Sequence, residues 1–486
     1  MRVAIIYPPF DFEGKIPLLS QNRVFIYTHS ERIKIYPLVM ASAATLLKVN
    51  GHDVLYLDGI NERLSREEFD NQLNDFSPEL VLLETKVPVI RKHWEYIKEE
   101  KIKDPERQYV LAGDHVSFFP TESMENSPVD FVITGGDYDV SLSKLVDYLE
   151  GKGNIPKGVY FRDGSNSGKF ELTPDLDTLH YIDRELTKWH IYGEAYLQRP
   201  CAYILTGRGC RGPKGVGVCR FCIWQFAFWN CSARLRSPAN VVNEIKLLVE
   251  NYGVKEIFDD NEAGSIWNKD WLIEFYQQMK KQDLIGKVII SSNARADCLL
   301  DKEVCKILKE TGFRMLKIGL ESGNDASLRR LGKATKVEEI VKGVKNAKDY
   351  GLRVMVTIMV GYPWESEREV NKTYQVAKEL LLYKTHCGDS LEANIISSYP
   401  GTPLFNDALR HNWFDIDPYD YEKYGLAKPI LKSPIDAEKW CNTIWKLHLH
   451  PVFILKSLLS ARNIHDIKLL FRGANSLLGH IKDYIK

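Results

Sequence analysis

The sequence predicts an α/β protein in which a doubly wound N-terminal domain precedes a partial β/α barrel and a helical tail. Three observations predict this fold class. The chain has 486 residues, enough for about three domains. Short β-rich runs alternate with helical patterns over residues 1–150 and again over 196–410, as expected for parallel sheets. Residues 411–486 show a helical pattern instead.

In the first 150 residues, turn signals separate predicted strands from predicted helices. Strands are expected at 3–6, 54–57, 80–83, 109–111 and 131–133, and helices at 38–50, 66–75 and 140–148. Gly51 ends the first helix. Ligands of such sheets bind beyond the carboxyl ends of the strands. The candidate ligand-binding residues at those ends are Tyr7, Pro8, Thr85, Gly113, His115, Gly135 and Gly136.

Residues 151–195 have weaker periodicity, and we expect them to connect the two α/β regions. The strands of the second region are predicted at 202–206, 254–259, 288–292, 315–319, 354–360 and 391–397. Ser237 and Pro238 are expected to begin one intervening helix, and Thr335 and Glu338 to form a capping box on another. Six β/α units are too few for a closed eight-stranded barrel, so we expect an open (β/α)6 barrel over 196–410.

The tail from 411 to 486 contains an aromatic and aliphatic helical stretch at 440–459. Two interpretations are open at this point. The stretch packs against the barrel, or it forms a surface that admits an apolar substrate or contacts a membrane peripherally.

Composition excludes several classes of protein. Lys and Arg total 65 and Asp and Glu total 65, so the net charge is zero and a general nucleic-acid binder is not expected. No run approaches the ~18 apolar residues of a membrane span. The first ten residues form a strand and a turn and lack the apolar core of a signal peptide. We therefore expect a soluble, cytoplasmic protein.

The nine cysteines point to the site of the chemistry, because five of them fall within residues 201–231. Clustered cysteines in a large cytosolic chain typically bind metal or do redox chemistry. Cys210, Cys219 and Cys222 lie in a glycine-rich segment after the first predicted barrel strand. Three thiolates can hold three irons of a 4Fe–4S cluster and leave one iron open. Two alternatives remain: a zinc site with Cys201 or Cys231 as fourth ligand, or replacement of Cys210 by one of these two.

With these cysteines, the chain resembles the cobalamin-binding subgroup of radical S-adenosylmethionine (SAM) enzymes. The family hallmark is Cys-x3-Cys-x2-Cys; here Cys219 and Cys222 match, but eight residues separate Cys210 from Cys219. Further family-like motifs end successive predicted strands, at 257–261, 292–295, 319–323, 359–363 and 399–403. Asp259 and Asp260 of the first motif are equally open to substrate-facing and structural roles.

The resemblance implies that SAM chelates the open iron through its amino and carboxylate groups. It assigns to SAM the residues Phe221, Asn293, Arg295, Glu321, Gly361 and Tyr399. Among these, Glu321 and Arg295 would contact the polar parts of SAM, and Phe221, Gly361 and Tyr399 would lie near its adenosine.

The N-terminal domain resembles the flavodoxin-like (Rossmann-like) cobalamin-binding module of this subgroup. Residues 112–115 resemble its Gly-Gly-x-His loop with Ala112 in place of the first glycine, and residues 135–138 resemble its last loop. The sequence contains no Asp-x-His-x-x-Gly stretch, so the resemblance implies that no histidine of such a motif ligates cobalt. Two points stay open: the module could lack a corrinoid, and His115 could be a structural residue.

The resemblance implies an enzyme that forms a 5′-deoxyadenosyl radical from SAM and modifies an unactivated carbon by methylation or cyclisation. An electron donor such as flavodoxin or ferredoxin and an apolar substrate, a lipid or a tetrapyrrole, are the expected partners. One alternative is a radical SAM enzyme with a corrinoid-free N-terminal domain that acts on a peptide or small metabolite. The other is a non-catalytic corrinoid- or metal-binding protein.

Overall fold

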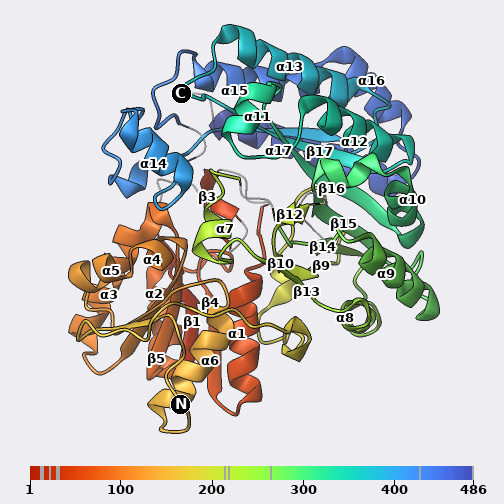
Figure 1. The fold of residues 1–486 in the computed structure, drawn as a ribbon. Coiled ribbons are helices and arrows are strands. Elements are labelled where there is room, and N and C mark those ends of the chain that lie inside the picture. Colours follow the sequence, from red (N-terminus) through yellow and green to blue (C-terminus); the bar gives the residue numbers. More distant parts are fainter. Residues whose placement is uncertain are drawn as a thin grey trace.

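The computed structural model describes residues 1–10, 16–20, 23–28, 33–212, 215–216, 219–262, 265–425 and 428–483, with the backbone alone for 16–20, 23–28, 216 and 476–483. Two α/β units face each other across a central layer that contains helix α7 (Ile223–Ala227) (Figure 1). Their sheets confirm the predicted α/β class.

The N-terminal sheet has the strand order β4-β1-β5-β6-β7-β8. Its strands are β1 (Arg2–Tyr7), β4 (Asp53–Asp58), β5 (Leu80–Thr85), β6 (Gln108–Gly113), β7 (Phe131–Ile133) and β8 (Val159–Phe161). The first five are parallel, which gives the doubly wound flavodoxin-like order. β8 is antiparallel to β7 and comes from the segment expected to be only a connector.

Helices cover both faces of this sheet. One face packs on α1 (Leu38–Val49) and α6 (Tyr138–Leu149), and the other on α2 (Arg66–Phe76) and α3 (Ile90–Lys103). Continuous apolar strands such as Leu80–Thr85, which are buried throughout, suit a sheet covered on both faces. As predicted, Gly51 follows the first helix with a positive φ of 84°.

The second sheet has the order β18-β17-β16-β15-β14-β9, which is sequential along the chain, and every neighbouring pair is parallel. Its strands are β9 (Cys201–Ile204), β14 (Glu256–Asp259), β15 (Ile289–Ala294), β16 (Phe313–Glu321), β17 (Arg353–Val360) and β18 (Ser390–Ile395). The intervening helices include α8 (Pro238–Tyr252), α9 (Lys269–Lys281), α10 (Lys302–Thr311), α12 (Val337–Asp349) and α13 (Glu367–Leu382). The predicted partial (β/α)6 barrel is confirmed.

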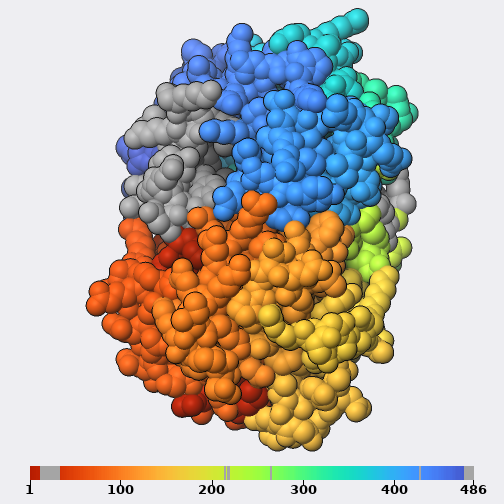
Figure 2. Space-filling view, turned by 90° about the vertical axis from the view of Figure 1, so that its left-hand side faces the viewer, coloured from red at the N-terminus to blue at the C-terminus, as the bar shows by residue number. Residues whose placement is uncertain are grey.

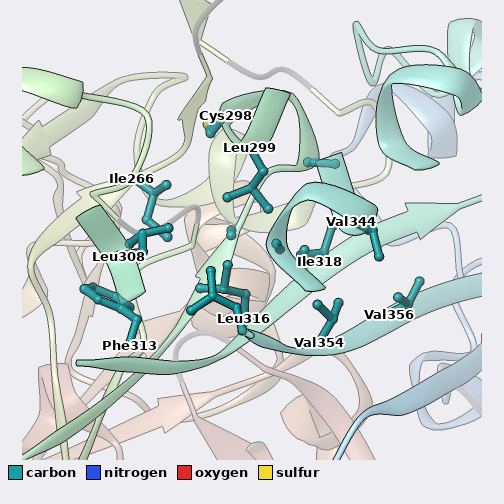
Figure 3. Packing of buried hydrophobic residues seen from close by; sticks show 14 of the residues in the cluster. Ile266, Cys298, Leu299, Leu308, Phe313, Leu316, Ile318, Val344, Val354 and Val356 are labelled. Atoms are coloured by element: carbon teal, nitrogen blue, oxygen red, sulfur yellow. The ribbon is translucent and has the colours of Figure 1, made fainter. Parts of the chain in front are cut away.

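The barrel core lies between the strands and these helices. Figure 3 shows Leu316, Ile318, Val354 and Val356 of β16 and β17 pointing toward Leu308 and Val344 of the covering helices. Cys298 and Cys305 are buried in this same cluster.

One helix start differs from its prediction. The Glu339 carboxylate, rather than that of Glu338, accepts a hydrogen bond from the backbone of Lys336 at 2.9 Å, and the helix begins at Val337. The predicted cap at Ser237 is confirmed, because its hydroxyl accepts from the Asn240 amide at 3.2 Å.

The tail is divided into α15 (Ala437–Trp445), α16 (Pro451–Leu459) and α17 (Ile464–Asp483). α15 covers the open edge of the barrel sheet: the Trp445 indole donates to the Ala393 carbonyl at 2.9 Å, and His448 accepts from the Leu391 amide at 3.1 Å. Covering an edge strand removes a template for unwanted pairing. Within the described part of the chain, no helix combines the length and apolar character needed to cross a membrane.

Residues just after the barrel pack on the N-terminal domain. Figure 2 shows this segment, in blue, lying directly on the orange surface of that domain. The Tyr421 hydroxyl donates to Glu122 at 3.0 Å, and Arg91 donates to the Tyr419 carbonyl at 3.0 Å. A hydrophobic cluster that includes Leu83, Leu111, Phe228, Tyr399 and Phe405 joins both domains. The N-terminal domain therefore packs on the rest of the chain through this segment and this cluster.

Candidate functional site

The cysteine segment leaves the barrel at the carboxyl end of β9 and first forms a hairpin of β10 (Gly207–Gly209) and β13 (Ala233–Leu235). Gly209 has φ of 94°, and a Cβ there would lie 2.0 Å from the Ser232 carbonyl oxygen. Only glycine fits this close approach. The Gly209 amide donates to the Glu262 carboxylate at 2.9 Å, which fixes the backbone just before Cys210.

The three predicted cluster ligands are partly buried and act on one another electrostatically. Burial raises the pKa of the Cys210 thiol to about 12, with a further increase from Cys219, while Arg295 opposes the shift. Burial also raises the pKa of Cys222, and both other thiols add to it. The three groups are therefore near enough to influence one another.

Among the described residues, no three His, Cys, Asp or Glu side chains converge closely enough for a single metal ion. In a zinc site all ligands meet one ion, whereas in an iron–sulfur cluster each thiolate binds its own iron.

Cys201 and Cys231 are poorly placed to replace these ligands. Cys201 begins β9, at the opposite end of the strand from the cysteine segment, and its thiol faces the Tyr192 carbonyl at 3.9 Å. Cys231 follows α7, and only burial shifts the pKa of its thiol.

Cationic groups border the thiols. Arg295, after β15, donates to Asp297 through Nε at 3.0 Å and Nη2 at 2.8 Å. A Cβ at Gly212 would lie 2.4 Å from Arg295 Nε, so the cysteine segment packs directly on the guanidinium. Lys333 and Arg295 both act electrostatically on Cys219. Such positive charge stabilises thiolates and an anionic cluster.

Glu321 has an unusual backbone conformation at the end of β16. Its φ is 62°, and the register with β17 shifts between Gly319 and Glu321. This bulge turns the carboxylate toward Lys333, with which it forms an ion pair. A Cβ at Gly319 would lie 2.0 Å from Glu321 Oε1 and 2.6 Å from Lys333 Nζ. A left-handed non-glycine residue of this kind is strained and is typical of functional sites.

Asp259 is a structural residue that links neighbouring strands through its carboxylate. Its carboxylate accepts from the Thr206 amide at 3.0 Å, the Thr206 hydroxyl at 2.8 Å and the Ser292 hydroxyl at 3.1 Å. Burial raises its pKa to about 6 despite these hydrogen bonds. Asp259 thus ties together the carboxyl ends of β9, β14 and β15, from which the site is built.

The remaining residues assigned to SAM lie at separate points of the structure. Asn293 donates to the Asn261 carbonyl at 2.9 Å, beside the strand ends. Phe221 lies between Cys219 and Cys222 and packs against the cluster shared by the two domains. Gly361, with φ of 88°, packs against Ala437 of α15. Tyr399 is buried with its ring 5.8 Å from that of Tyr424, on the side of the N-terminal domain.

The carboxyl edge of the N-terminal sheet is rich in buried polar groups. The Tyr7 hydroxyl donates to Glu84, and Lys86 lies 3.0 Å from the same carboxylate. Thr85 and His93 are hydrogen-bonded at 2.8 Å, and burial lowers the pKa of His93 to about 3, so its imidazole is neutral. Lys86 Nζ and Glu84 Oε1 form this ion pair, whereas His93 Nε2 has no hydrogen-bond partner among the described residues.

The glycines predicted at this edge permit close packing. A Cβ at Gly113 would lie 2.0 Å from the Thr85 carbonyl, and one at Gly136 would lie 2.4 Å from the Trp229 ring. A Cβ at Gly135 would similarly meet Phe170 at 2.5 Å. Pro8 follows β1 and is half-buried.

His115 is buried and contacts Glu122 at 2.9 Å, with its ring 4.6 Å from that of Tyr421. These contacts connect the Gly113–His115 turn to the segment that follows the barrel, which is a structural role.

A buried ion network connects the two domains at the base of the cysteine segment. Arg208 of β10 donates to Asp137 at 2.7 Å and to Asp139 at 2.6 Å, and Arg234 of β13 donates to Asp137 at 2.6 Å. Burial alone would raise the pKa of Asp137, but Arg208 and Arg234 lower it well below its usual range. Sequence reasoning missed both arginines and Glu262, because their partners lie far away along the chain.

The chain is similar to several known proteins. Residues 204–377 match the Radical SAM superfamily. An uncharacterised methyltransferase of Pyrococcus horikoshii is 26% identical over 408 residues, covering 82% of this chain and 83% of that protein. An anaerobic magnesium-protoporphyrin IX monomethyl ester cyclase of Rubrivivax gelatinosus is 26% identical over 408 residues, covering 82% of this chain and 70% of the cyclase.

A solved structure has the same fold. It is that of TsrM, a radical S-adenosylmethionine methyltransferase from Kitasatospora setae with cobalamin and a 4Fe–4S cluster bound. It matches with a TM-score of 0.68 at 16% identity, covering 100% of this chain and 99% of TsrM. The chain thus contains a segment that matches the Radical SAM superfamily, is similar over 82% of its length to a methyltransferase and a cyclase, and shares the fold of TsrM in both of its α/β units.

Proposed function

We propose that this protein is a cobalamin-dependent radical SAM enzyme that methylates or cyclises an apolar substrate, either a lipid or a tetrapyrrole. One observation carries the proposal. At the carboxyl ends of the barrel strands, the three thiols lie close to a cationic and an anionic side chain: Cys210, Cys219 and Cys222 with Arg295 and Glu321. Active sites of β/α barrels lie at that end.

The residues present fit a 4Fe–4S cluster and SAM. Cys210, Cys219 and Cys222 would hold three irons, and Arg295 and Lys333 offset the negative charge. When bound, the cluster supplies the electron that cleaves SAM. Glu321 would hold the SAM amino group, since its strained backbone directs the carboxylate into the site, and Arg295 would orient the SAM carboxylate. The barrel and N-terminal domain together exclude water from these groups.

The residues at the domain interface fit a corrinoid. Buried polar atoms without hydrogen-bond partners among the described residues lie on both sides, His93 Nε2 on one and Trp224 and Gln225 of α7 on the other. Unsatisfied buried donors and acceptors are costly, and an amide-rich ligand would satisfy them. When bound, a corrinoid supplies a transferable methyl group.

The apolar substrate class is supported by the surroundings of the site. Aromatic and aliphatic side chains, including Phe228, Trp229 and Tyr362, form the cluster shared by the two domains. The similarity to a protoporphyrin ester cyclase is in keeping with such a substrate. The reductant we propose is a flavodoxin or ferredoxin in the cytoplasm.

Anaerobic reconstitution tests the proposed chemistry. The full chain, loaded with iron, sulfide and hydroxocobalamin, should retain a corrin absorption spectrum and release 5′-deoxyadenosine when given SAM and a reductant. Absence of 5′-deoxyadenosine and of methylated product from a fully loaded sample would refute the enzymatic proposal. Mass spectrometry of lipids and tetrapyrroles from cells with and without the protein would identify the substrate class.

Gly319→Ala should weaken SAM binding without unfolding the protein. The added Cβ displaces only the ends of two flexible side chains, Glu321 and Lys333, so the fold can adjust while the carboxylate moves. We expect SAM affinity to fall by roughly tenfold, equivalent to losing about one charge-assisted hydrogen bond.

Equilibrium dialysis of SAM with reconstituted protein measures this effect. Gly425→Ala is the matched control, because nothing lies within 4 Å of a Cβ at that position. Unchanged SAM affinity in Gly319→Ala would remove Glu321 from the proposed SAM site.

A further inference from the structure

The end of α16 and the outer face of α17 expose an unusual number of apolar side chains. Most of the exposed large apolar residues of the described chain lie between Leu449 and Phe471. The most exposed are Leu455 at 58%, Leu458 at 58%, Leu459 at 76%, Ile464 at 58% and Phe471 at 71%. Only residues 460–463 separate the two helices along the chain. Exposed apolar patches of this kind mark interaction sites.

The inner side of α17 holds it against the barrel. α17 crosses the amino ends of the barrel strands: Asp466 pairs with Arg353 at the start of β17, and Arg472 donates to the Leu197 carbonyl at 2.9 Å. Leu469 is buried. The opposite face, with Ile464, Ile467 and Phe471 at helical spacing, remains exposed.

A cavity of about 430 Å³ lies beside this exposed face. Its lining residues are Gln198, Arg199, His465, Lys468, Phe471 and Arg472. Among the described residues, no carboxylate forms an ion pair with Arg199, Lys468 or Arg472, and the buried Nε of Arg472 has no partner. Guanidinium groups with free donors bind phosphate well.

The charge of this region differs from that of the chain as a whole, which is neutral. Between residues 446 and 475 the basic residues are Lys446, Lys456, Arg462, Lys468 and Arg472, whereas the acidic residue is Asp466, which is buried against Arg353. Lysine and arginine around exposed leucine, isoleucine and phenylalanine are the features of a helix that lies in the interface of an anionic bilayer.

We propose that the α16–α17 surface binds an anionic phospholipid bilayer, with the cavity lined by Arg199, Lys468 and Arg472 taking a lipid phosphate. Leu455, Leu458, Leu459, Ile464 and Phe471 enter the acyl boundary beside it. The surface lies at the amino ends of the barrel strands, away from the cysteine segment, so this binding does not depend on the proposed chemistry.

Co-sedimentation of the full chain with vesicles tests the proposal. We expect binding to vesicles of phosphatidylcholine mixed with phosphatidylglycerol, little binding to phosphatidylcholine alone, and weaker binding as salt concentration rises. Lys468→Glu should lower the partition coefficient by roughly tenfold or more, since each charge near the surface contributes about fivefold. Leu459→Asp and Phe471→Asp should each lower it by a similar factor.

Two matched controls test whether the effect is local. Ile102→Asp changes an 83% exposed side chain on α3, and Lys306→Glu changes an exposed lysine on α10; both should bind vesicles as the parent chain does. Circular dichroism of every variant checks its folding. Equal losses in the controls, or unchanged binding in the three α16–α17 variants, would overturn the proposal.

Two further measurements distinguish other occupants of the surface. Binding of inorganic phosphate without any vesicle binding would identify a site for free phosphate and overturn the bilayer proposal. A dimer in sedimentation velocity that Phe471→Asp dissociates, again without vesicle binding, would identify the surface as a contact between two copies of the chain.

Discussion

Cys222→Ala should abolish SAM cleavage and leave almost no iron bound, and Cys210→Ala and Cys219→Ala should do the same. Each thiol is expected to hold one iron, and the three lie near enough to influence one another, so a missing thiol leaves a site that two side chains cannot fill. Iron should fall from about four atoms per chain to near zero after anaerobic reconstitution. Iron analysis and 5′-deoxyadenosine measurement check the two effects separately.

Cys231→Ser is the matched control for these variants. It changes a cysteine of the same segment that is partly buried and whose pKa no other thiol influences. The control should retain iron and SAM cleavage. Retention of a full cluster by Cys210→Ala together with its loss in Cys231→Ser would show that Cys231 is a ligand, and it would overturn the assignment of Cys210.

Arg208→Met should lower the free energy of unfolding by about 3–5 kcal/mol, the usual cost of removing one partner from a buried ion pair. Asp137 and Asp139 are almost inaccessible to solvent, and the variant leaves Asp139 without its guanidinium partner. Urea denaturation followed by tryptophan fluorescence measures the change. Lys287→Met, which breaks an exposed pair with Asp283, should cost at most about 1 kcal/mol.

The same network predicts a dependence of stability on pH. Because the pKa of Asp137 is lower in the folded chain than in the unfolded chain, its contribution is present above the unfolded pKa of about 3.9 and is lost as pH falls further. The parent protein should therefore lose stability more steeply below about pH 4 than Arg208→Met. Parallel acid-unfolding curves for the two proteins would contradict this role of Arg208.

Hydrophobic periodicity and turn residues were sufficient to predict most of the fold. Alternating β-rich and helical runs predicted all eleven parallel strands, because each strand is a short apolar run bounded by glycine, proline or polar turns. The antiparallel β8 was missed, since its three residues lie in a segment without clear periodicity. The predicted tail helix at 440–459 is interrupted before His450 and Pro451, because proline begins a new helix more readily than it continues one.

The candidate site could be predicted only in part. Cysteine clustering predicted Cys210, Cys219 and Cys222 as ligands, and the family resemblance implied Arg295 and Glu321; the structure places these two side chains close enough to Cys219 to act on it electrostatically. The strain at Glu321 and its pairing with Lys333 could not be predicted, because they arise from a bulge against a neighbouring strand.

The amino-acid sequence by itself determined the local elements, because short-range patterns specify strands, helices and caps, and the thiols of its glycine-rich segment predict a metal-binding group. Only the tertiary structure decided that Asp259 is structural, that Arg208 connects the two domains, and that the apolar face of α17 stays exposed beside a basic cavity. The physical reason is that hydrogen bonds, ion pairs and burial depend on contacts between segments that are distant in the sequence. Local sequence patterns do not specify those contacts.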